Sequence, residues 1–373
     1  MKIGIVIHSG AFLFSNGITQ NAYFIYQCLE NNGYTCSFLC NDAEPKPFSY
    51  RGLPLTTIST DLTVFNPTEY ALIITVTRGI TGVQHEMFHR YKIPVIGFIC
   101  GNHYMQDLED FIRGPRESGK CFTGKAVGTD EIWLISSFAH SRTYFEVLRK
   151  CPVYMVPHLW HHSPLKERAA SLSKVDESAL FYNIAKHTGK KIDIVIVEPN
   201  ISFCKNAWGP LLACEKLHMM MPDLIDNVYV FNFPGHNYAH AMADELTLGS
   251  KLRRFNRLEI DEILVFFSKK DTVPIFITHH ILTSLNYLYY ELLYYGYPLV
   301  HNSEDLGGCG YLYSDIDSCV EEILNAYKHH NKHIDTYRED GAAYLENINP
   351  LNPIVGNIWK QLISSALATA SSW

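Results

Sequence analysis

Apolar and polar residues alternate along the chain in short blocks that predict strands separated by helices. An apolar run over residues 3–7 is followed by a polar loop, then by apolar residues every three or four positions over Thr19–Asn31, and then by a second apolar run over Thr35–Cys40. A strand, a loop, a helix and a strand in this order form the βαβ unit of a parallel sheet. The loop lacks the Gly-x-Gly-x-x-Gly pattern of dinucleotide-binding proteins, so the sequence gives no reason to expect NAD or FAD.

The same alternation continues through the rest of the chain. Further strands are expected at Ala71–Val76, Pro94–Phe98, Glu131–Ser136, Val153–Val156, Lys191–Val197, Asn227–Phe233, Glu262–Phe267 and Val273–Ile277, and helices include Gly82–Tyr91, Ser141–Lys150, a segment from Asn206 to Leu217, and Pro353–Leu367. A chain of 373 residues suits two domains of ordinary size. We therefore expect an α/β protein with two doubly wound parallel sheets: residues 1–157 and 191–350 form the domains, 158–190 is a linker with a charged helical segment, and 351–373 is a C-terminal helix.

Residues 279–302 hold the most informative pattern. Leucines at three-and-four spacing predict a helix, Gly296 is placed to cap it in the left-handed conformation, and Leu299-Val300 begins a buried strand. Glu291 is the one acid on this otherwise apolar helix. We expect it near the carboxyl edge of the sheet, where open α/β sheets bind ligands.

Composition narrows the class of protein. The net charge is −7, so no strongly basic DNA-binding face is visible in the totals. A local basic cluster at Arg113, Arg116, Lys120 and Lys125 is either a solvated loop or an acceptor-binding patch. The ten cysteines form no Cys-x-x-Cys pair and favour buried free thiols, and adjacent histidines are poor chelators, so we expect no metal site.

No apolar stretch reaches the length of a membrane span, and the first residues form a strand pattern without the features of a signal peptide. These observations predict a cytoplasmic protein without a membrane span.

The loop Glu198–Asn206 is a candidate phosphate site. It lies between a predicted strand and a predicted helix, and helix N-termini bind anions. Lys205 stands at the start of that helix, where its charge opposes the helix dipole and a bound anion would relieve the conflict. We favour phosphate binding over a solvated lysine, and we expect Asn200 to orient a sugar or phosphate.

Two sequence blocks carry a resemblance. Glu291, Gly296, Pro298, Leu299 and Val300 match an order that resembles the donor half of GT-B glycosyltransferases, in which such a Glu accepts hydrogen bonds from the ribose of a nucleotide-sugar. The longer string from Asn286 to Asn302, together with Val197–Asn200 and Lys205, is similar to a little-characterised family of bacterial and phage GT-B-like proteins. The resemblance implies a GT-B fold whose final helix packs back on the first domain, and a donor site at Glu198, Asn200, Lys205, Asn286, Glu291, His301 and Asn302.

The resemblance also implies an activity, namely metal-independent transfer of a hexosyl or pentosyl group from a nucleotide-sugar to an acceptor hydroxyl. A UDP-linked donor is expected, with no other cofactor, and the acceptor is a glycan, a protein or modified DNA. The base that activates the acceptor should come from the first domain, where His8, His85 and His103 qualify by residue type and approximate position. Each of the three is also explained as a structural histidine.

Two alternatives stay open. The first is a phage-type enzyme that modifies hydroxymethylated pyrimidines in DNA. The second is a non-catalytic nucleotide- or sugar-binding protein on a GT-B scaffold. The second alternative is supported by the absence of a second Glu, which many retaining GT-B enzymes carry about two helical turns before the ribose Glu. Thr283 or its neighbours stand there in this sequence. A periplasmic-type sugar-binding protein is disfavoured because no export signal is seen.

Overall fold

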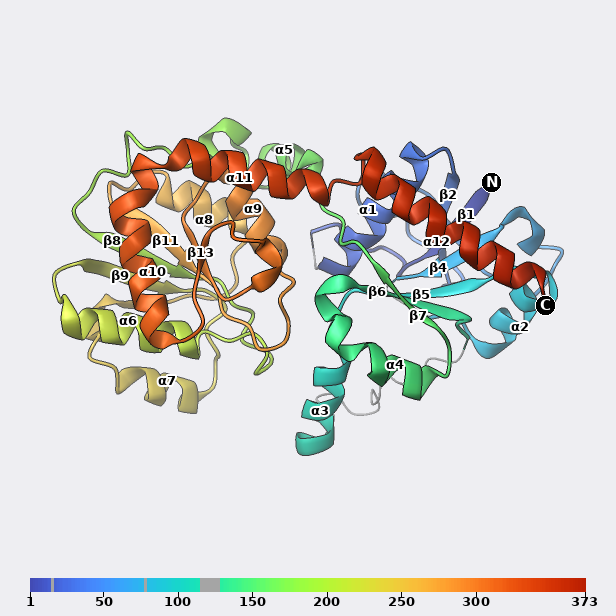
Figure 1. The fold of residues 1–373 in the computed structure, drawn as a ribbon, viewed down its shortest axis with the longest axis horizontal. Coiled ribbons are helices and arrows are strands. Elements are labelled where there is room, and N and C mark those ends of the chain that lie inside the picture. Colours follow the sequence, from blue (N-terminus) through green and yellow to red (C-terminus); the bar gives the residue numbers. More distant parts are fainter. Residues whose placement is uncertain (15–16, 77–78, 115–127) are drawn as a thin grey trace. The chain divides into compact units, whose positions relative to one another are not determined.

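The computed structural model describes residues 1–14, 17–76, 79–114 and 128–373, and it divides into two compact units (Figure 1). The first unit holds Met1–His161 and Asn347–Trp373, and the second holds His162–Glu346. Each unit is a parallel sheet with helices packed on it, so the predicted α/β class with two parallel sheets is confirmed. Three members of the predicted basic cluster, Arg116, Lys120 and Lys125, lie outside the described residues.

The first sheet has the strand order β3-β2-β1-β4-β5-β6-β7, and every neighbouring pair is parallel. Its strands are β1 Lys2–Val6, β2 Thr35–Cys40, β3 Leu55–Thr57, β4 Leu72–Thr75, β5 Val95–Ile99, β6 Glu131–Ile135 and β7 Val153–Val156. The chain winds outward from β1 in one direction and then outward from β4 in the other. The switch point between β1 and β4 is where such sheets open a crevice at their carboxyl edge.

Helices of the first unit include α1 Gly17–Asn31, α2 Gly82–Arg90, α3 His103–Arg113, α4 Arg142–Arg149 and α12 Pro353–Ser371. The last of these, coloured red in Figure 1, belongs to the first unit although it comes from the end of the chain. Trp359 on α12 is fully buried, and its ring centre lies 5.6 Å from that of Trp133 and 6.0 Å from that of Phe98. Gly356 is needed because a Cβ there would overlap the side chain of Asn32.

The second sheet has the order β10-β9-β8-β11-β12-β13 and is also parallel. Its strands are β8 Ile192–Ile196, β9 Ile225–Val230, β10 Leu252–Arg254, β11 Val273–Ile277, β12 Leu299–His301 and β13 Tyr311–Leu312. Helices of this unit are α5 Ser163–Arg168, α6 Trp208–Met220, α7 Asn237–Asp244, α8 Ile260–Phe267, α9 Tyr287–Tyr295, α10 Ile316–His329 and α11 Ile334–Asn347. Residues of α6 and α10 share one apolar core cluster with the strands, and the two helices lie side by side in Figure 1. The switch point of this sheet lies between β8 and β11.

Three predictions about the second unit need correction. Glu262–Phe267 is not a strand but the body of α8, because Ile260, Ile263, Leu264 and Phe267 are buried with helical spacing and Glu259 forms a capping box with Glu262. The helix expected from residue 279 begins only at Tyr287, because Leu282 has a left-handed φ of 51°. Residues 162–190 are part of the second unit instead of a linker, and they bury Arg168, Tyr182 and His187 in it.

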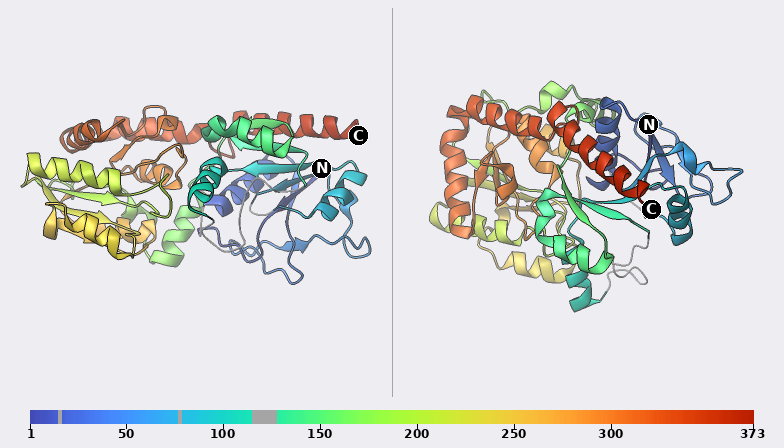
Figure 2. Two further views of the ribbon diagram at one scale, coloured as in Figure 1. Left: turned by 90° about the horizontal axis from the view of Figure 1, so that it is seen from below. Right: turned by 45° about the vertical axis from the view of Figure 1, so that its right-hand side comes forward.

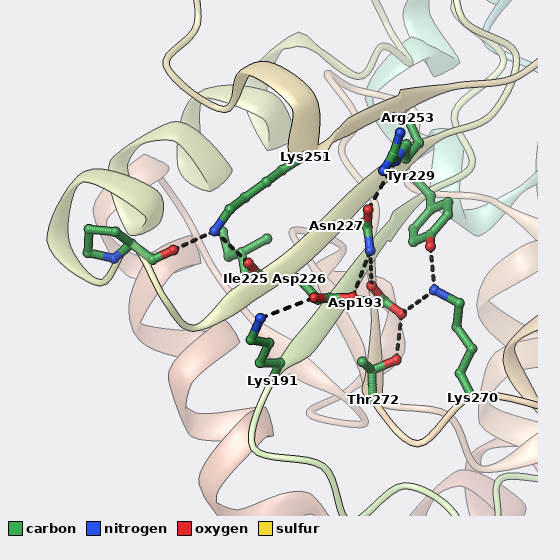
Figure 3. A network of polar contacts seen from close by, with 11 residues as sticks. Lys191, Asp193, Ile225, Asp226, Asn227, Tyr229, Lys251, Arg253, Lys270 and Thr272 are labelled. Atoms are coloured by element: carbon green, nitrogen blue, oxygen red, sulfur yellow. Dashed lines mark hydrogen bonds and ion pairs between the residues drawn. The ribbon is translucent and has the colours of Figure 1, made fainter.

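A polar network ties the amino-terminal ends of β8 and β9 to their neighbours (Figure 3). Asp193 on β8 is fully buried, and it accepts hydrogen bonds from Lys270 Nζ at 2.9 Å, from Asn227 Nδ2 at 3.3 Å and from Thr272 Oγ1. The ammonium of Lys270 also lies 4.7 Å from the ring centre of Tyr229. A buried carboxylate needs such compensation, so this cluster fixes the end of the sheet that is opposite to its carboxyl edge.

Among the described residues, none of the helices combines the length and the apolar character that crossing a bilayer requires.

Candidate ligand site at the carboxyl edge of the second sheet

Three loops meet where β8, β11 and β12 end, and hydrogen bonds join them. Glu198, after β8, accepts a hydrogen bond from the backbone N–H of His279, after β11, at 2.9 Å. Asn302, after β12, accepts from His280 N at 3.0 Å and donates to His280 O at 2.8 Å. Lys205 Nζ donates to the carbonyl of Leu285. Hydrogen bonds therefore join the loops at the switch point into one polar network.

Asn200 shapes the first of these loops. It has a left-handed φ of 53°, and its side-chain nitrogen donates to Glu198 O at 3.0 Å and to Asn232 O at 3.1 Å. Its side-chain oxygen accepts from Ala207 N at 2.7 Å, at the start of α6. Asn200 thus positions the loop and the first turn of α6.

Glu198 carries a carboxyl group that is fully buried beside this loop. Burial raises its pKa to about 7, and the nearby charge of Lys205 and the N–H of His279 oppose that rise. Its Oε2 atom has no hydrogen-bond partner. A buried carboxyl oxygen without a partner is costly, and a hydrogen bond from a ligand hydroxyl would offset that cost.

His280 and Thr283 contribute two further buried polar atoms without partners. His280 Nδ1 accepts from Thr283 N at 3.3 Å, which assigns the ring proton to Nε2, and Nε2 is buried and has no partner. Burial and the charges of Lys205 and His279 lower the pKa of His280 to about 4, so the ring is neutral at pH 7. Thr283 Oγ1 is likewise buried without a partner.

Lys205 supplies the positive charge of the site. It is half-buried, and burial lowers its pKa while Glu198 acts in the opposite direction. An ammonium, an imidazole N–H, a hydroxyl and a carboxyl thus gather at one switch point. This donor and acceptor set suits a ligand that has both an anionic group and hydroxyl groups.

Two residues predicted to contact the ligand, His301 and Asn286, form hydrogen bonds within the protein. His301 is fully buried, its Nε2 donates to Cys309 O at 2.7 Å, and its Nδ1 accepts from Ser303 N at 3.1 Å. Asn286 caps α9 by accepting from Leu288 N at 3.2 Å. Both side chains hold the loops in place, and direct contact with a ligand remains a prediction for them.

Glu291 lies in a different polar cluster from Lys205. Its Oε1 accepts from Arg168 Nη1 at 2.8 Å, and the other side of the guanidinium binds Asp261 with Nε at 3.0 Å and Nη2 at 2.6 Å (the Arg168 cluster). Glu291 is 5% exposed, and burial raises its pKa while Arg168 opposes the rise. A ribose hydroxyl would have to share this carboxylate with Arg168, so the ribose contact stays a prediction.

The three histidines predicted as bases lie at different ends of the first sheet. His8 follows β1 and His103 opens α3 after β5, both at the carboxyl edge. His103 Nδ1 is buried without a partner, and burial lowers the pKa of this ring to about 4. His85 instead binds Asp130 at 2.9 Å, and Asp130 also accepts from Val95 N at the start of β5. His85 therefore lies at the amino edge of the sheet, away from the other two.

Sequence reasoning missed Arg168, Asp261 and His280. Arg168 and Asp261, the other members of the Glu291 cluster, are 123 and 30 positions away from Glu291 in the sequence. A local sequence pattern therefore cannot predict that they lie together. The position of His280 shortly after the buried strand β11 is a signal in the sequence that points to it. Among the described residues, no group of three or more His, Cys, Asp or Glu side chains is arranged to hold a metal ion.

The sequence matches one family model over residues 2–363, described as a protein of unknown function (DUF2827). The chain belongs to this family. No curated protein matches the sequence significantly.

Several solved structures share the fold. Sucrose-phosphate synthase from Thermosynechococcus elongatus has a TM-score of 0.57 at 10% identity, over 98% of this chain and 99% of that one. An alpha-glucosyltransferase in complex with UDP and a 13-mer DNA containing a HMU base has a TM-score of 0.58 at 12% identity, over 98% and 99%. The trehalose-6-phosphate phosphatase N-terminal domain from Candida albicans has a TM-score of 0.59 at 10% identity, over 98% and 96%. At these identities the likeness concerns the fold, and it confirms the expected GT-B class.

Proposed function

We propose that this protein is a glycosyltransferase that binds a nucleotide-sugar at the carboxyl edge of its second sheet. The observation that carries the proposal is a group of three buried polar atoms without partners, Glu198 Oε2, His280 Nε2 and Thr283 Oγ1, beside the ammonium of Lys205. Native proteins seldom leave such atoms unsatisfied. A bound ligand that supplies hydroxyl groups and an anion would satisfy all three.

The proposed roles follow from the chemistry of each group. Lys205 and the Nε2–H of His280 are donors suited to a diphosphate, on which negative charge grows as the glycosidic bond breaks. Glu198 and Thr283 are suited to hydroxyl groups of the sugar. UDP is the first nucleotide to test, because a protein of the same fold has been solved with UDP. Glu291 is proposed for the ribose, with Arg168 holding its carboxylate in place.

The experiment is to incubate the protein with UDP-, GDP- and dTDP-sugars and to measure release of the nucleoside diphosphate, since transferases commonly transfer slowly to water. We expect one donor to be cleaved, and Glu198→Gln to slow cleavage at least tenfold, because the buried carboxyl contacts the sugar in this proposal. Glu321→Gln on α10 is the matched control, since Glu321 is exposed on the same unit. Absence of cleavage with every donor would count against an enzyme.

The non-catalytic alternative gives a different result in the same experiment. A binding protein on this scaffold would bind a nucleotide-sugar with measurable affinity and would release no nucleoside diphosphate. The absence of the second Glu of many retaining enzymes, where Thr283 or its neighbours stand, supports this alternative.

Modified DNA is a second candidate acceptor, favoured by the structural likeness to a glucosyltransferase solved with DNA containing a HMU base. Binding of a duplex with hydroxymethylated pyrimidines that weakens steeply as salt rises would support it. Failure to bind such a duplex at low salt would leave a glycan or a protein as the acceptor.

A further inference from the structure

A cavity of about 220 Å³ lies at the amino edge of the first sheet. Its walls come from the last turn of α2, from residues around the starts of β5, β6 and β7, and from the C-terminal part of α12. Figures 1 and 2 both show the C-terminal end of α12 (red) beside α2, and the rings of Trp373 and His89 stack with their centres 4.4 Å apart. A cavity of about 150 Å³ already holds a molecule the size of benzene, so this one has room for a small organic ligand.

Two neighbouring carboxyl groups line this cavity, and the first of them is compensated within the protein. Asp130 Oδ1 lies 2.9 Å from His85 Nε2 and 3.9 Å from His89 Nδ1. Asp130 Oδ2 accepts a hydrogen bond from the backbone N–H of Val95 at 2.8 Å. The carboxylate of Asp130 therefore has its partners already, and it adds negative charge beside Glu131.

Glu131 is the carboxyl group that lacks compensation. It is 6% exposed, and its Oε1 accepts a hydrogen bond from Trp133 Nε1 at 2.9 Å. Its Oε2 has no hydrogen-bond partner in the part of the chain that the structure describes. Burial raises the pKa of Glu131, the N–H of Trp133 opposes that rise, and Asp130 adds to it. A buried carboxyl group without a cation beside it is unusual, because buried charges are normally paired.

The side chain of Glu131 points toward α12. Its partner Trp133 lies two positions further along β6, so both side chains are on the same face of the sheet. That face is covered by α12, because the ring centre of Trp133 lies 5.6 Å from that of Trp359. Thr369 and Trp373 of the same helix form that wall of the cavity. The unpartnered oxygen of Glu131 therefore faces the cavity.

The surroundings favour a positive charge in the cavity. The last turns of α12 end there, and the C-terminal end of a helix carries partial negative charge that stabilises cations. Lys92 Nζ donates to the carbonyl of Ser371 at 3.5 Å, and among the described residues no lysine or arginine lines the cavity. Within the same described ranges, no group of three or more His, Cys, Asp or Glu side chains is arranged to hold a metal ion, so an organic cation fits better.

We propose that this cavity binds a small organic cation, a primary alkylammonium, whose N–H groups donate to Glu131 Oε2 and whose alkyl chain packs against Tyr154 and Trp373. A primary ammonium is favoured over a quaternary one, because the carboxyl oxygen requires an N–H donor. An anionic ligand is disfavoured by the two carboxyl groups. This inference goes beyond the proposed function, because the nucleotide-sugar site is built from residues of the second unit and this cavity from residues of the first.

The test is a ligand-observed NMR titration of the intact chain with pentylammonium chloride and, in parallel, with 1-pentanol, which has the same number of non-hydrogen atoms and no charge. Glu131→Gln removes the charge and keeps the size of the side chain, and Glu44→Gln, at an exposed position of the same unit, is its matched control. Thr369→Phe fills the cavity from an exposed position on α12 without altering either carboxyl group. Ala368→Phe, exposed on the same helix outside the cavity lining, is the control for that variant.

We expect pentylammonium to bind at least tenfold more tightly than 1-pentanol, because its charged N–H groups meet a carboxylate. Glu131→Gln and Thr369→Phe should each weaken the binding of pentylammonium at least tenfold, whereas the two control variants keep it within twofold. If Glu131→Gln does not fold, the comparison of Thr369→Phe with Ala368→Phe decides. Equal affinity for the two probes, no binding of either, or equal effects of a variant and its control would overturn the proposal.

Discussion

At the scale of single residues, hydrogen bonding distinguishes a structural role from a binding role. A side chain whose polar atoms all bind within the protein has a structural role. His301 and His280 both follow buried strands at the same edge, yet both ring nitrogens of His301 are used within the protein, whereas Nε2 of His280 is buried without a partner. Asn200 is similar to His301, because its side-chain oxygen and nitrogen are both engaged. At this edge of the second sheet, we therefore propose that a ligand contacts His280 Nε2 and leaves the ring of His301 untouched.

Glu198 gives a prediction about pH. Its pKa is about 7 in the folded protein against about 4.5 when unfolded, so the folded state binds more protons between these values. The free energy of unfolding then falls as pH rises from about 4.5 to 7, by roughly 1–3 kcal/mol, since one pKa unit corresponds to about 1.4 kcal/mol. Glu198→Gln removes this loss of unfolding free energy, because an amide does not titrate.

Urea unfolding at pH 5 and pH 8 should show the variant gaining stability relative to wild type at the higher pH. A difference that is the same at both pH values would contradict the assignment.

At the scale of elements, the Arg168 cluster joins α5, α8 and α9. Its three charged side chains are each at most 6% exposed. Removing one member of a buried ion cluster leaves charge without compensation, which costs more than the cluster itself contributes. Arg168 therefore fixes the position of α9, the helix that carries Glu291.

Arg168→Met should lower the free energy of unfolding by about 3–5 kcal/mol, because two buried carboxylates would then lack a partner. Arg142→Met is the control, since the Arg142–Glu146 pair is exposed and such pairs contribute at most about 0.5 kcal/mol. Urea unfolding of both variants checks this. If both substitutions lower the free energy of unfolding by the same amount, the Arg168 cluster does not contribute to holding α5, α8 and α9 together.

The sequence predicted elements well where a pattern was local, and poorly where partners were distant. β2 begins and ends as expected at Thr35–Cys40, and Gly296 caps α9 with a φ of 74°. The apolar run of Glu262–Phe267 is short, and short apolar runs fit either a strand or a helix, so the pattern alone predicts the wrong structure. The pairing of Glu291 with Arg168 has no local signature, so the environment of the predicted ribose contact could not be foreseen. The spacing of the leucines likewise gives no sign that Leu282 adopts a left-handed backbone conformation.

At the scale of the whole molecule, each unit has its own sheet and its own core, and the last helix of the chain completes the first. Trp359 on α12 fills a place between Trp133 and Phe98. Trp359→Ala should destabilise the first unit by about 3–5 kcal/mol, whereas Ile354→Ala, at a 73% exposed position on the same helix, should change little.

Hydrogen exchange measures this effect unit by unit. The Trp359→Ala variant should lose amide protection in β5 and β6 while β8 and β11 keep theirs. An equal loss of protection in both sheets would contradict the view that α12 serves the first unit alone.

The measurement that tests the central claim most directly is calorimetric titration of UDP into wild type, Lys205→Met and Lys216→Met. Lys216 is the matched control, because it lies on α6 of the same unit and pairs with the exposed Asp317. We predict one site per chain in wild type, at least tenfold weaker binding in Lys205→Met because the diphosphate loses its cation, and unchanged binding in Lys216→Met. Absence of binding by UDP and the other nucleoside diphosphates, or equal affinity in the two variants, would contradict a nucleotide-sugar site at the carboxyl edge of the second sheet.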